Sequence, residues 1–366
     1  MRKVKSGSAG AVLMAVLMLA GCAPDGDADG ADDKTGFAED ATVGVLLPEE
    51  EDGDIGQARD TGELFAEALE GAGFTADVQF QNPSPKADER GQIEDMIDSG
   101  AKVLIIADVH IGRSVDVLND ARDDGVIIIA YERLNPWGTI ADYGVAVDHF
   151  EVGESQAKAL LEGLAEKYPE QSTYTVELFS GVPSDDDDTT MFEGAMSILQ
   201  PKIDDGTLVV VSGEVSRKET DTESWRENSI TRMDALLQGP YQSVSLDGVL
   251  VPNDLHAQAV IESVSAHGRE VPVVVGQGSA PDAVSSIVSG VQYATTYTDE
   301  RDLVDMAITM VEQLQGGEKV TVVPSRPETE QFIDFPTNLL APVLATHENA
   351  AEVYADDPDL APLTQP

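Results

Sequence analysis

Polar side chains stand directly after short apolar runs at several places along this sequence. They are carboxylates, a guanidinium and carboxamides, and the residues are Asp108, Arg133, Asp148, Asn253, Asp254 and Gln277. Planar groups of this kind form paired hydrogen bonds, so they suit adjacent hydroxyl groups that donate and accept together. Trp225, in a loop rich in polar residues, offers a flat apolar face for the C–H groups of a sugar ring. The set therefore favours a sugar or another polyol as ligand.

Each of these residues also has a purely structural interpretation. Asp108 and Asp254 stand where an acidic side chain caps a helix that follows a strand. Arg133 could form a structural ion pair, and Trp225 could equally belong to the surface or to a core. As one constellation, however, the residues favour ligand contact over these separate roles.

The sequence carries no catalytic signature. It lacks a Gly-x-Ser-x-Gly elbow, a Gly-x-x-x-x-Gly-Lys-[Ser/Thr] loop and a Gly-x-Gly-x-x-Gly run after its first predicted strand. Its histidines are scattered, with no His-x-x-x-His pair, so a hydrolytic zinc site is unsupported. Asp108 and Asp148 are candidate carboxylates for a glycosidase, but nothing in the pattern sets the spacing that this chemistry needs. We therefore predict a binding protein with no cofactor.

The acidic run Asp185–Asp188 suggests a metal ion at first sight. It lacks the alternating ligands, the turn glycine and the terminal glutamate of an EF-hand loop. We interpret it as a solvated loop that favours the start of a helix near Thr190, and we predict no metal site.

The elements that position these residues are predicted from hydrophobic patterning. Near-continuous apolar runs of strand length alternate with segments whose apolar residues recur at helical spacing. The predicted strands are 42–47, 103–107, 126–130, 143–147, 176–179, 208–211, 249–251 and 271–275, and the clearest predicted helices are 152–167, 191–203, 229–238 and 257–266. This alternation predicts an α/β fold of two doubly wound lobes, each with a parallel sheet covered on both faces. Ligands of such sheets lie beyond the carboxyl ends of the strands.

The amino-acid composition excludes some classes of binding partner. The chain has 366 residues, with 22 Lys and Arg against 68 Asp and Glu, a net charge of −46. Nucleic acids and anionic lipid headgroups are usually bound through basic clusters, so neither is expected. The length predicts two domains. The high negative charge favours a soluble monomer.

The first residues resemble an export signal. Arg2, Lys3 and Lys5 precede the apolar run 9–20, which is too short to span a bilayer and predicts a signal peptide over residues 1–21. The run ends in Leu19-Ala20-Gly21-Cys22, which resembles a bacterial lipobox and marks Cys22 as the site of lipid attachment. Residues 22–41 are rich in Asp, Gly and Ala and predict a disordered acidic leash. The expected location is extracytoplasmic, on the cell membrane, held by lipid.

The body resembles a known family in the order and spacing of several stretches. These are Val103–Asp108, Ile129–Leu134, Val147–Gly153, Glu177–Gly181, Phe192–Ser197, Arg232–Asp234, Gly290–Tyr293 and Pro336–Val343. They are similar to the type I periplasmic sugar-binding proteins of ABC transporters, particularly the multiple-monosaccharide, xylose and galactose-binding group. The resemblance extends from about Val43 to Asn349, nearly the whole mature chain.

The resemblance implies two lobes joined by three crossings, with one sugar between them. It places the crossings near Asp148, Gln277 and Thr298. The first lobe would then be 42–147 plus 278–297, and the second 148–277 plus 298–334, with 335–366 packed back as a tail. Asp108 and Arg133 would hold hydroxyls from the first lobe. The contacts expected from the second lobe or the hinge are Asp148, Trp225, Asn253, Asp254 and Gln277. The loop at Asp185–Asp188 would border the same cleft.

Three positions depart from the family pattern. The acidic loop Glu49–Asp54 stands where an Arg–aromatic or related ligand pair is common, Gly278 replaces an Asp, and Thr298 replaces a frequent Lys. A sugar is therefore a firmer expectation than any particular sugar.

The resemblance implies a solute-binding lipoprotein that captures a monosaccharide, of the xylose, glucose or galactose kind, and delivers it to an ABC permease and ATPase. Closure would follow because only the closed form lets both lobes contact one ligand. A sensor that reports a sugar or another signal to a membrane receptor could use the same fold, and the sequence does not separate the two. An enzyme acting on exported sugars is a third hypothesis.

Overall fold

The computed structural model describes residues 36–48, 55–81, 89–107, 111–134, 140–182, 185–223, 225–322 and 335–365. Five sequence-based predictions lie outside these residues: the signal peptide, lipid attachment at Cys22, most of the leash, the loop Glu49–Asp54 and the ligand role of Asp108. Among the described residues, no helix combines the length and the apolar character needed to cross a membrane.

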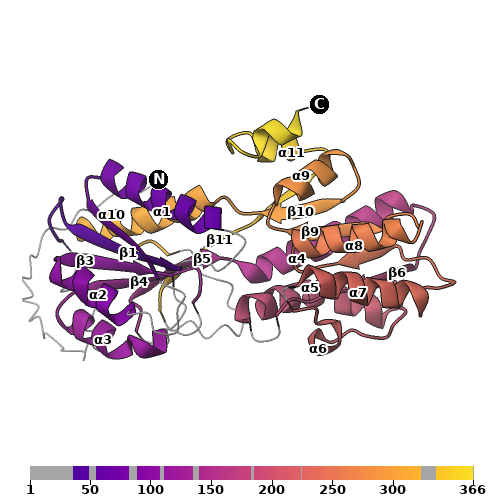
Figure 1. Cartoon of the computed structure of the whole chain (residues 1–366), viewed down its shortest axis with the longest axis horizontal. Helices are drawn as coiled ribbons and strands as arrows, with labels where there is room; N and C mark the ends of the chain where they lie inside the picture. Colours follow the sequence, from indigo (N-terminus) through magenta and orange to yellow (C-terminus); the bar gives the residue numbers. More distant parts are fainter. Residues whose placement is uncertain are drawn as a thin grey trace, which may run out of the picture.

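The chain forms two α/β lobes side by side, each built on a sheet of six strands (Figure 1). The strand orders are β11-β5-β4-β3-β1-β2 in the first lobe and β12-β10-β9-β8-β6-β7 in the second. Every pairing is parallel except that of β12, which runs antiparallel to β10. The prediction of two doubly wound parallel lobes is thereby confirmed.

The first lobe contains β1 (Thr42–Pro48), α1 (Ile55–Gly71), β2 (Thr75–Gln81), α2 (Glu89–Asp98), β3 (Ala101–Ile106), η1 (Ile111–Arg113), α3 (Val115–Asp123), β4 (Ile127–Tyr131), β5 (Tyr143–Val147), α10 (Glu300–Gln315) and β11 (Thr337–Leu340). Its central strands β1, β3, β4 and β5 are buried on both faces, as continuous apolar runs require. In β4, Ile127 and Ile129 pack with α1 and α10, whereas Ile128 and Ala130 pack with α2 and α3 on the opposite face.

The second lobe contains α4 (His149–Lys167), β6 (Tyr174–Leu178), α5 (Asp186–Asp204), β7 (Leu208–Val210), α6 (Arg217–Thr220), α7 (Arg226–Gln238), β8 (Gly248–Leu250), α8 (Asp254–Ala266), β9 (Val273–Gln277), α9 (Pro281–Val288), β10 (Ala294–Tyr297), β12 (Val343–Thr346), α11 (Ala350–Val353) and η3 (Ala361–Thr364). Here α4 and α5 cover one face of the sheet, and α7 and α8 cover the other.

The predicted membership of the later segments is wrong. Strand β10 pairs with β9, so it belongs to the second lobe rather than the first. Helix α10 buries Leu303, Val304 and Val311 in the core of the first lobe, where Figure 1 shows it beside α1. The tail is also divided, because β11 completes the first sheet and β12 the second.

Three crossings connect the lobes, and two of them fall where they were predicted. The first lies between β5 and α4 at Asp148, and the second between β10 and α10, beside Thr298. The third joins β11 to β12 through Ala341 and Pro342, whereas the sequence predicted it at Gln277. Gln277 instead ends β9 inside the second lobe.

The predicted leash does not extend to residue 41, because residues 36–41 are attached to the first lobe. Gly36 donates a backbone hydrogen bond to the Leu314 carbonyl at 2.9 Å. The ring of Phe37 lies 6.3 Å from that of Phe74, centre to centre. An apolar side chain at 37 thus anchors residues 36–41 to the first lobe, which the acidic composition of the segment concealed.

Candidate functional site

The carboxyl ends of the strands bring residues of both lobes together beside the crossings. Arg133, after β4 of the first lobe, lies 3.6 Å (Nη2 to Oδ2) from Asp185, which precedes α5 of the second. Val152 and Met191 of the second lobe pack into the same apolar cluster as Val147 of the first. The two lobes therefore meet through an ion pair and a shared apolar cluster.

Glu132 adjoins this ion pair and is held in a strained conformation. Its φ of +64° is rare for a residue with a side chain. The carboxylate accepts no hydrogen bond from the described part of the chain. Burial, and then the negative charges of Glu300 and Asp187, raise the pKa of Glu132 to about 8, while Arg133 opposes the shift.

Glu300 ties the second crossing to the first lobe. Its Oε1 accepts hydrogen bonds from the Tyr131 hydroxyl at 2.7 Å and from the Thr61 hydroxyl at 3.3 Å. Burial raises the pKa of Glu300, and these two hydrogen bonds oppose the rise. The hydrogen bonds join the start of α10 to the end of β4, next to Glu132.

The second lobe contributes the first turn of α5. Asp185 caps this helix by accepting from the backbone amides of Asp187 and Asp188, which supports the helix-start interpretation of the acidic run. Asp187 lies 3.8 Å (Oδ2 to Nε2) from His149, the first residue of α4. Burial raises the pKa of Asp187, and His149 opposes that effect. Within the described residues, no three potential ligand side chains are placed to hold a metal ion.

Asp148 stands at the first crossing, as predicted. Its side chain accepts from the backbone N–H of Glu151 at 2.9 Å and so caps α4. Its own backbone N–H donates to the Leu340 carbonyl of β11. Asp148 is half-buried and lies at the crossing, where its side chain is used to cap α4.

Asn253 and Trp225 lie on neighbouring loops of the second lobe. Asn253 caps α8 through Oδ1, which accepts from the backbone N–H of His256 at 3.2 Å. The His256 ring in turn contacts the Glu223 carbonyl oxygen, two residues before Trp225. Trp225 is the N-cap residue of α7 and is 65% exposed, which excludes a core position and is compatible with a ligand platform or with an ordinary surface residue.

Asp254 has a different environment from the one predicted for a ligand contact. It is 2% exposed, and its carboxylate accepts hydrogen bonds from Gln292, the Thr295 hydroxyl and the Ser279 backbone within the second lobe. Burial raises the pKa of Asp254 to about 6, against the effect of those hydrogen bonds. The carboxylate thus joins α8 to β10 and to the loop after β9. This role is structural, but it is not the helix cap considered from the sequence, which Asn253 provides.

Gln277 ends β9 and is half-buried. Its carboxamide makes no hydrogen bond to the described residues, so it is available to a ligand. Gly278 follows with φ +116°, and Ser279, at φ +61°, sends its hydroxyl to the Tyr354 hydroxyl at 2.7 Å. An aspartate at position 278 would have to adopt a φ that favours glycine.

Backbone strain coincides with these loops. The three non-glycine residues with positive φ in the described chain are Glu132, Glu223 and Ser279. They follow β4, precede α7 and follow β9, respectively. Strain of this kind costs about 1–3 kcal/mol per residue and gathers at ligand sites. The sequence singled out Arg133, Asn253 and Gln277 but missed the neighbouring roles of Glu300 and His256. Glu300 bonds to Tyr131 and His256 contacts Glu223, and both of these partners are far away in sequence.

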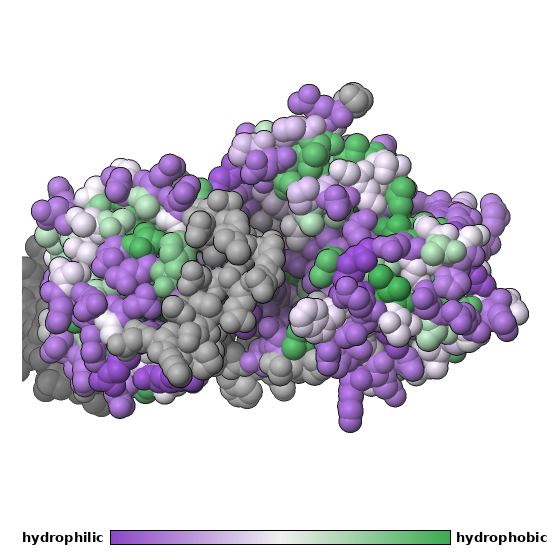
Figure 2. Space-filling view, in the orientation of Figure 1, coloured by the Kyte–Doolittle hydropathy of each residue, from purple (hydrophilic) through white to green (hydrophobic). Residues whose placement is uncertain are grey.

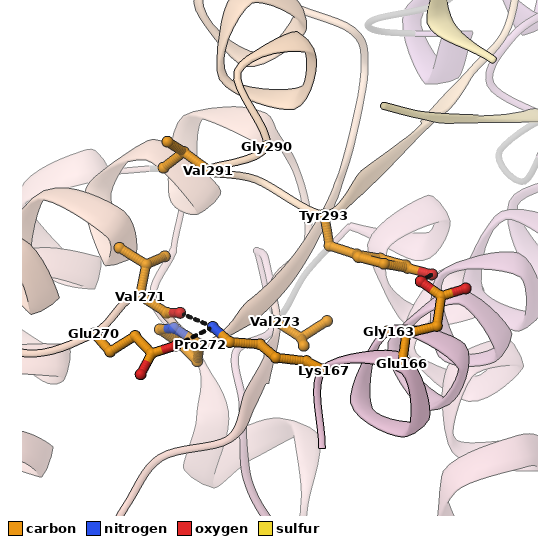
Figure 3. A pocket seen from close by; sticks show the side chains of 10 residues that line it. All are labelled: Gly163, Glu166, Lys167, Glu270, Val271, Pro272, Val273, Gly290, Val291 and Tyr293. Atoms are coloured by element: carbon orange, nitrogen blue, oxygen red, sulfur yellow. Dashed lines mark hydrogen bonds and ion pairs between the residues drawn. The ribbon is translucent and has the colours of Figure 1, made fainter. Parts of the chain in front are cut away.

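A separate cavity of about 490 Å³ lies at the opposite edge of the second lobe (Figure 3). It is lined by the end of α4 and by the segments before β9 and β10. Its polar groups are already paired: Lys167 contacts Glu270 and the Val271 carbonyl, and the Tyr293 hydroxyl donates to Glu166 at 2.9 Å. None of the predicted site residues lines it.

Two α/β lobes, three crossings and polar side chains at the facing strand ends define a two-lobed binding protein that holds its ligand between the lobes. The chain belongs to the periplasmic binding protein domain family, whose model matches residues 43–319. This confirms the resemblance seen in the sequence and the prediction of a binding protein rather than an enzyme.

The relatives are sugar-binding proteins, and the similarity extends over most of their length. The chain is 33% identical over 327 residues to the multiple sugar-binding periplasmic receptor ChvE of Rhizobium radiobacter, covering 87% of this chain and 90% of that protein. It is 34% identical to the multiple sugar-binding periplasmic protein SbpA of Azospirillum brasilense, covering 75% and 78%. An ABC transporter solute-binding protein from Clostridium phytofermentans, solved with β-D-glucose, superposes with a TM-score of 0.73 at 28% identity, covering 88% of this chain and 100% of that one.

Proposed function

We propose that this protein captures a monosaccharide between its lobes and delivers it to the permease of an ABC transporter. The observation that carries the proposal is the likeness to sugar-binding relatives across both lobes. The largely exposed Arg133 guanidinium and the Gln277 carboxamide, which has no hydrogen bond within the described residues, support it at the strand ends. D-glucose is the first candidate ligand, because the C. phytofermentans structure holds it.

We assign ligand contact to Arg133 from the first lobe, to Asp148 at the crossing and to the second-lobe residues Trp225, Asn253 and Gln277. Asp108 stays in this set on the strength of the sequence alone. Asp254 is assigned a structural role instead, because its carboxylate forms hydrogen bonds inside the second lobe.

The surface of the molecule bears on how the ligand is held. Figure 2 shows that hydrophilic residues cover most of the visible face of both lobes. With a net charge of −46, the protein has no electrostatic means of attracting a neutral sugar. Affinity must come from hydroxyl pairing and ring stacking after contact.

The proposal is tested by thermal unfolding of the protein with D-glucose, D-galactose, D-xylose, myo-inositol and D-glucuronate, with L-glucose as the control. A ligand at about 100 times its Kd adds about 2.7 kcal/mol to the free energy of unfolding, so the midpoint rises clearly. We expect a rise with at least one D-monosaccharide and its loss in Arg133→Ala and Asn253→Ala. No rise with any sugar would contradict monosaccharide capture.

We further propose that Cys22 carries a lipid that holds the protein on the outer side of the cell membrane. The support is the lipobox-like sequence Leu19–Cys22. Mass spectrometry of the membrane fraction should find a diacylated N-terminal cysteine, and Cys22→Ser should release the protein from that fraction. An unmodified cysteine in the membrane-bound protein would refute the anchor.

A further inference from the structure

His256 is a buried histidine that lies between two parts of the proposed site. It is 1% exposed and lies in the first turn of α8. Its Nδ1 is 2.7 Å from Oδ1 of Asn253, and its Nε2 is 3.1 Å from the Glu223 carbonyl oxygen. The ring therefore connects the start of α8 to the loop that leads to Trp225.

The contacts around Asn253 define which way its carboxamide points. Oδ1 accepts from the backbone N–H of His256 at 3.2 Å and faces ring Nδ1 at 2.7 Å. A flipped amide would turn its NH2 group toward the backbone N–H, where two donors would oppose each other. The oxygen therefore faces the helix, and Nδ2, which has no hydrogen bond within the described residues, faces outward.

The second contact of the ring supports a strained loop. Glu223 has a φ of +52°, and its backbone N–H donates to Oδ1 of Asp221 at 2.7 Å. The Asn228 carboxamide donates to the Thr222 carbonyl at 3.1 Å. With His256 next to the Glu223 carbonyl, two successive residues, Thr222 and Glu223, are contacted from outside the loop. Trp225 follows directly.

The ring has one proton for two acceptors when it is neutral. Burial lowers the pKa of His256, which favours the neutral ring. The shorter contact, to Asn253, identifies Nδ1 as the protonated nitrogen, and the Glu223 contact is served in addition when the ring is doubly protonated.

We propose that His256 is a positioning residue for the sugar site, which turns the Nδ2 donor of Asn253 toward the ligand and packs against the loop that leads to Trp225. At this point the second lobe donates a hydrogen bond, which an oxygen of the ligand accepts. The identity of the ligand rests on the proposed function, whereas the coupling among these residues does not.

Three substitutions separate the two contacts. His256→Phe removes both ring nitrogens, His256→Asn retains an N–H near the place of Nδ1, and His256→Gln places its amide nearer to Nε2. His267→Phe is the matched control, because His267 ends the same helix and contacts the Ser263 carbonyl away from the site. We expect the Kd for D-glucose, measured by calorimetry, to rise about tenfold in His256→Phe. His256→Asn should recover most of this loss, and the control should bind as the wild type does.

A double-mutant cycle then distinguishes positioning from a loss of general stability. If His256 acts through Asn253, His256→Phe adds little to the effect of Asn253→Ala on the Kd. Fully additive effects, or no change in Kd in His256→Phe, would overturn the proposal.

A measurement without ligand keeps this inference separate from the choice of sugar. Nitrogen NMR of the ring should show a proton on Nδ1 of His256. In a Trp137→Phe background, His256→Phe should change the fluorescence of Trp225, and His267→Phe should not. A ring protonated only on Nε2, or unchanged fluorescence, contradicts the proposal. If the wild-type protein ignores D-glucose but shows both signatures, only the sugar assignment fails.

Discussion

At the scale of single residues, Glu132 has an unfavourable backbone conformation and an unfavourable environment for its charge. Its backbone has φ +64°, and its carboxylate shares the interlobe space with Glu300 and Asp187. Such a group binds a proton more tightly in the folded chain than in the unfolded one. Its acidity and that of its neighbours make stability and lobe contact sensitive to pH.

The pKa of Glu132 gives a prediction with a definite sign. It is about 8 in the folded protein, against an ordinary value of 4.5. Between these values the folded state holds more protons than the unfolded state, so the free energy of unfolding falls as pH rises. Glu132→Gln should reduce this fall, as measured by thermal unfolding from pH 5 to pH 8. The exposed Glu193, changed to Gln, serves as the control, and an unchanged slope in Glu132→Gln would refute the assignment.

Asp254 supports a prediction about stability. Its oxygens accept from Gln292, Thr295 and Ser279, so Asp254→Asn would bring an NH2 group against donors. Unmet buried groups cost about 1–3 kcal/mol each, and we expect a loss of about 2 kcal/mol in the free energy of unfolding. Urea unfolding at pH 7.5 measures it, with the exposed Asp282→Asn in the first turn of α9 as the control. A variant that unfolds like the wild type but loses its sugar would restore Asp254 to the ligand set.

The sequence could locate these residues but not assign their roles. Positions after strands predict nearness to the site, because parallel strands end at one edge of a sheet. Whether a carboxylate meets a ligand or a helix depends on partners such as Gln292 and Thr295, which are 38 and 41 positions from Asp254. One sequence does not reveal such pairings. Trp225 and Asp254 therefore looked alike, although one is exposed and the other is buried.

At the scale of elements, α4 and α5 determine how the hinge side of the second lobe is built. An added Cβ at Gly153 would meet the Met191 carbonyl oxygen at 1.8 Å, and one at Gly194 would meet the Phe150 carbonyl oxygen at 2.1 Å. The two helices therefore touch backbone to backbone. This contact sets their first turns, with His149 and Asp187, beside each other.

Separating these helices should destabilise the lobe. Gly153→Ala forces the backbones apart, and we expect it to lower the free energy of unfolding by about 3 kcal/mol, the upper end for overpacking. Gly71→Ala, at the open end of α1 with nothing within 4 Å, should be neutral or slightly stabilising. Urea unfolding compares the two. Equal stability of Gly153→Ala and the wild type would contradict the close packing.

Elements with buried apolar runs were predictable, and those with mixed composition were not. Strands β3 and β4 consist mainly of aliphatic residues and are almost entirely buried. Strand β2, by contrast, lies at the edge of its sheet, its sequence TADVQFQ is mostly half-buried, and it was missed. The sequence also could not predict which lobe α10 packs on, because the apolar stripe of this helix would fit either core.

At the scale of the whole molecule, the contact between Arg133 and Asp185 links the lobes across the site. Arg133 is largely exposed, so the pair adds little to stability, but it favours the lobe arrangement seen here. We expect Arg133→Gln without ligand to increase the radius of gyration in X-ray scattering. In the wild type, 1 M salt should have a similar effect, because salt screens exposed pairs. Arg226→Gln, which removes a pair within the second lobe, is the control, and identical scattering curves for Arg133→Gln and the wild type would contradict a role in lobe arrangement.

The return of the chain through both lobes near its end has a consequence for how the protein is made. Residues 337–346 supply β11 to one sheet and β12 to the other. A polypeptide that stops before them leaves β5 and β10 as open sheet edges, and open edges pair readily with other chains. A prematurely terminated product would therefore lack a strand in both sheets and be prone to aggregate. Neither lobe would be complete on its own, so such a product would be recognised as misfolded as a whole.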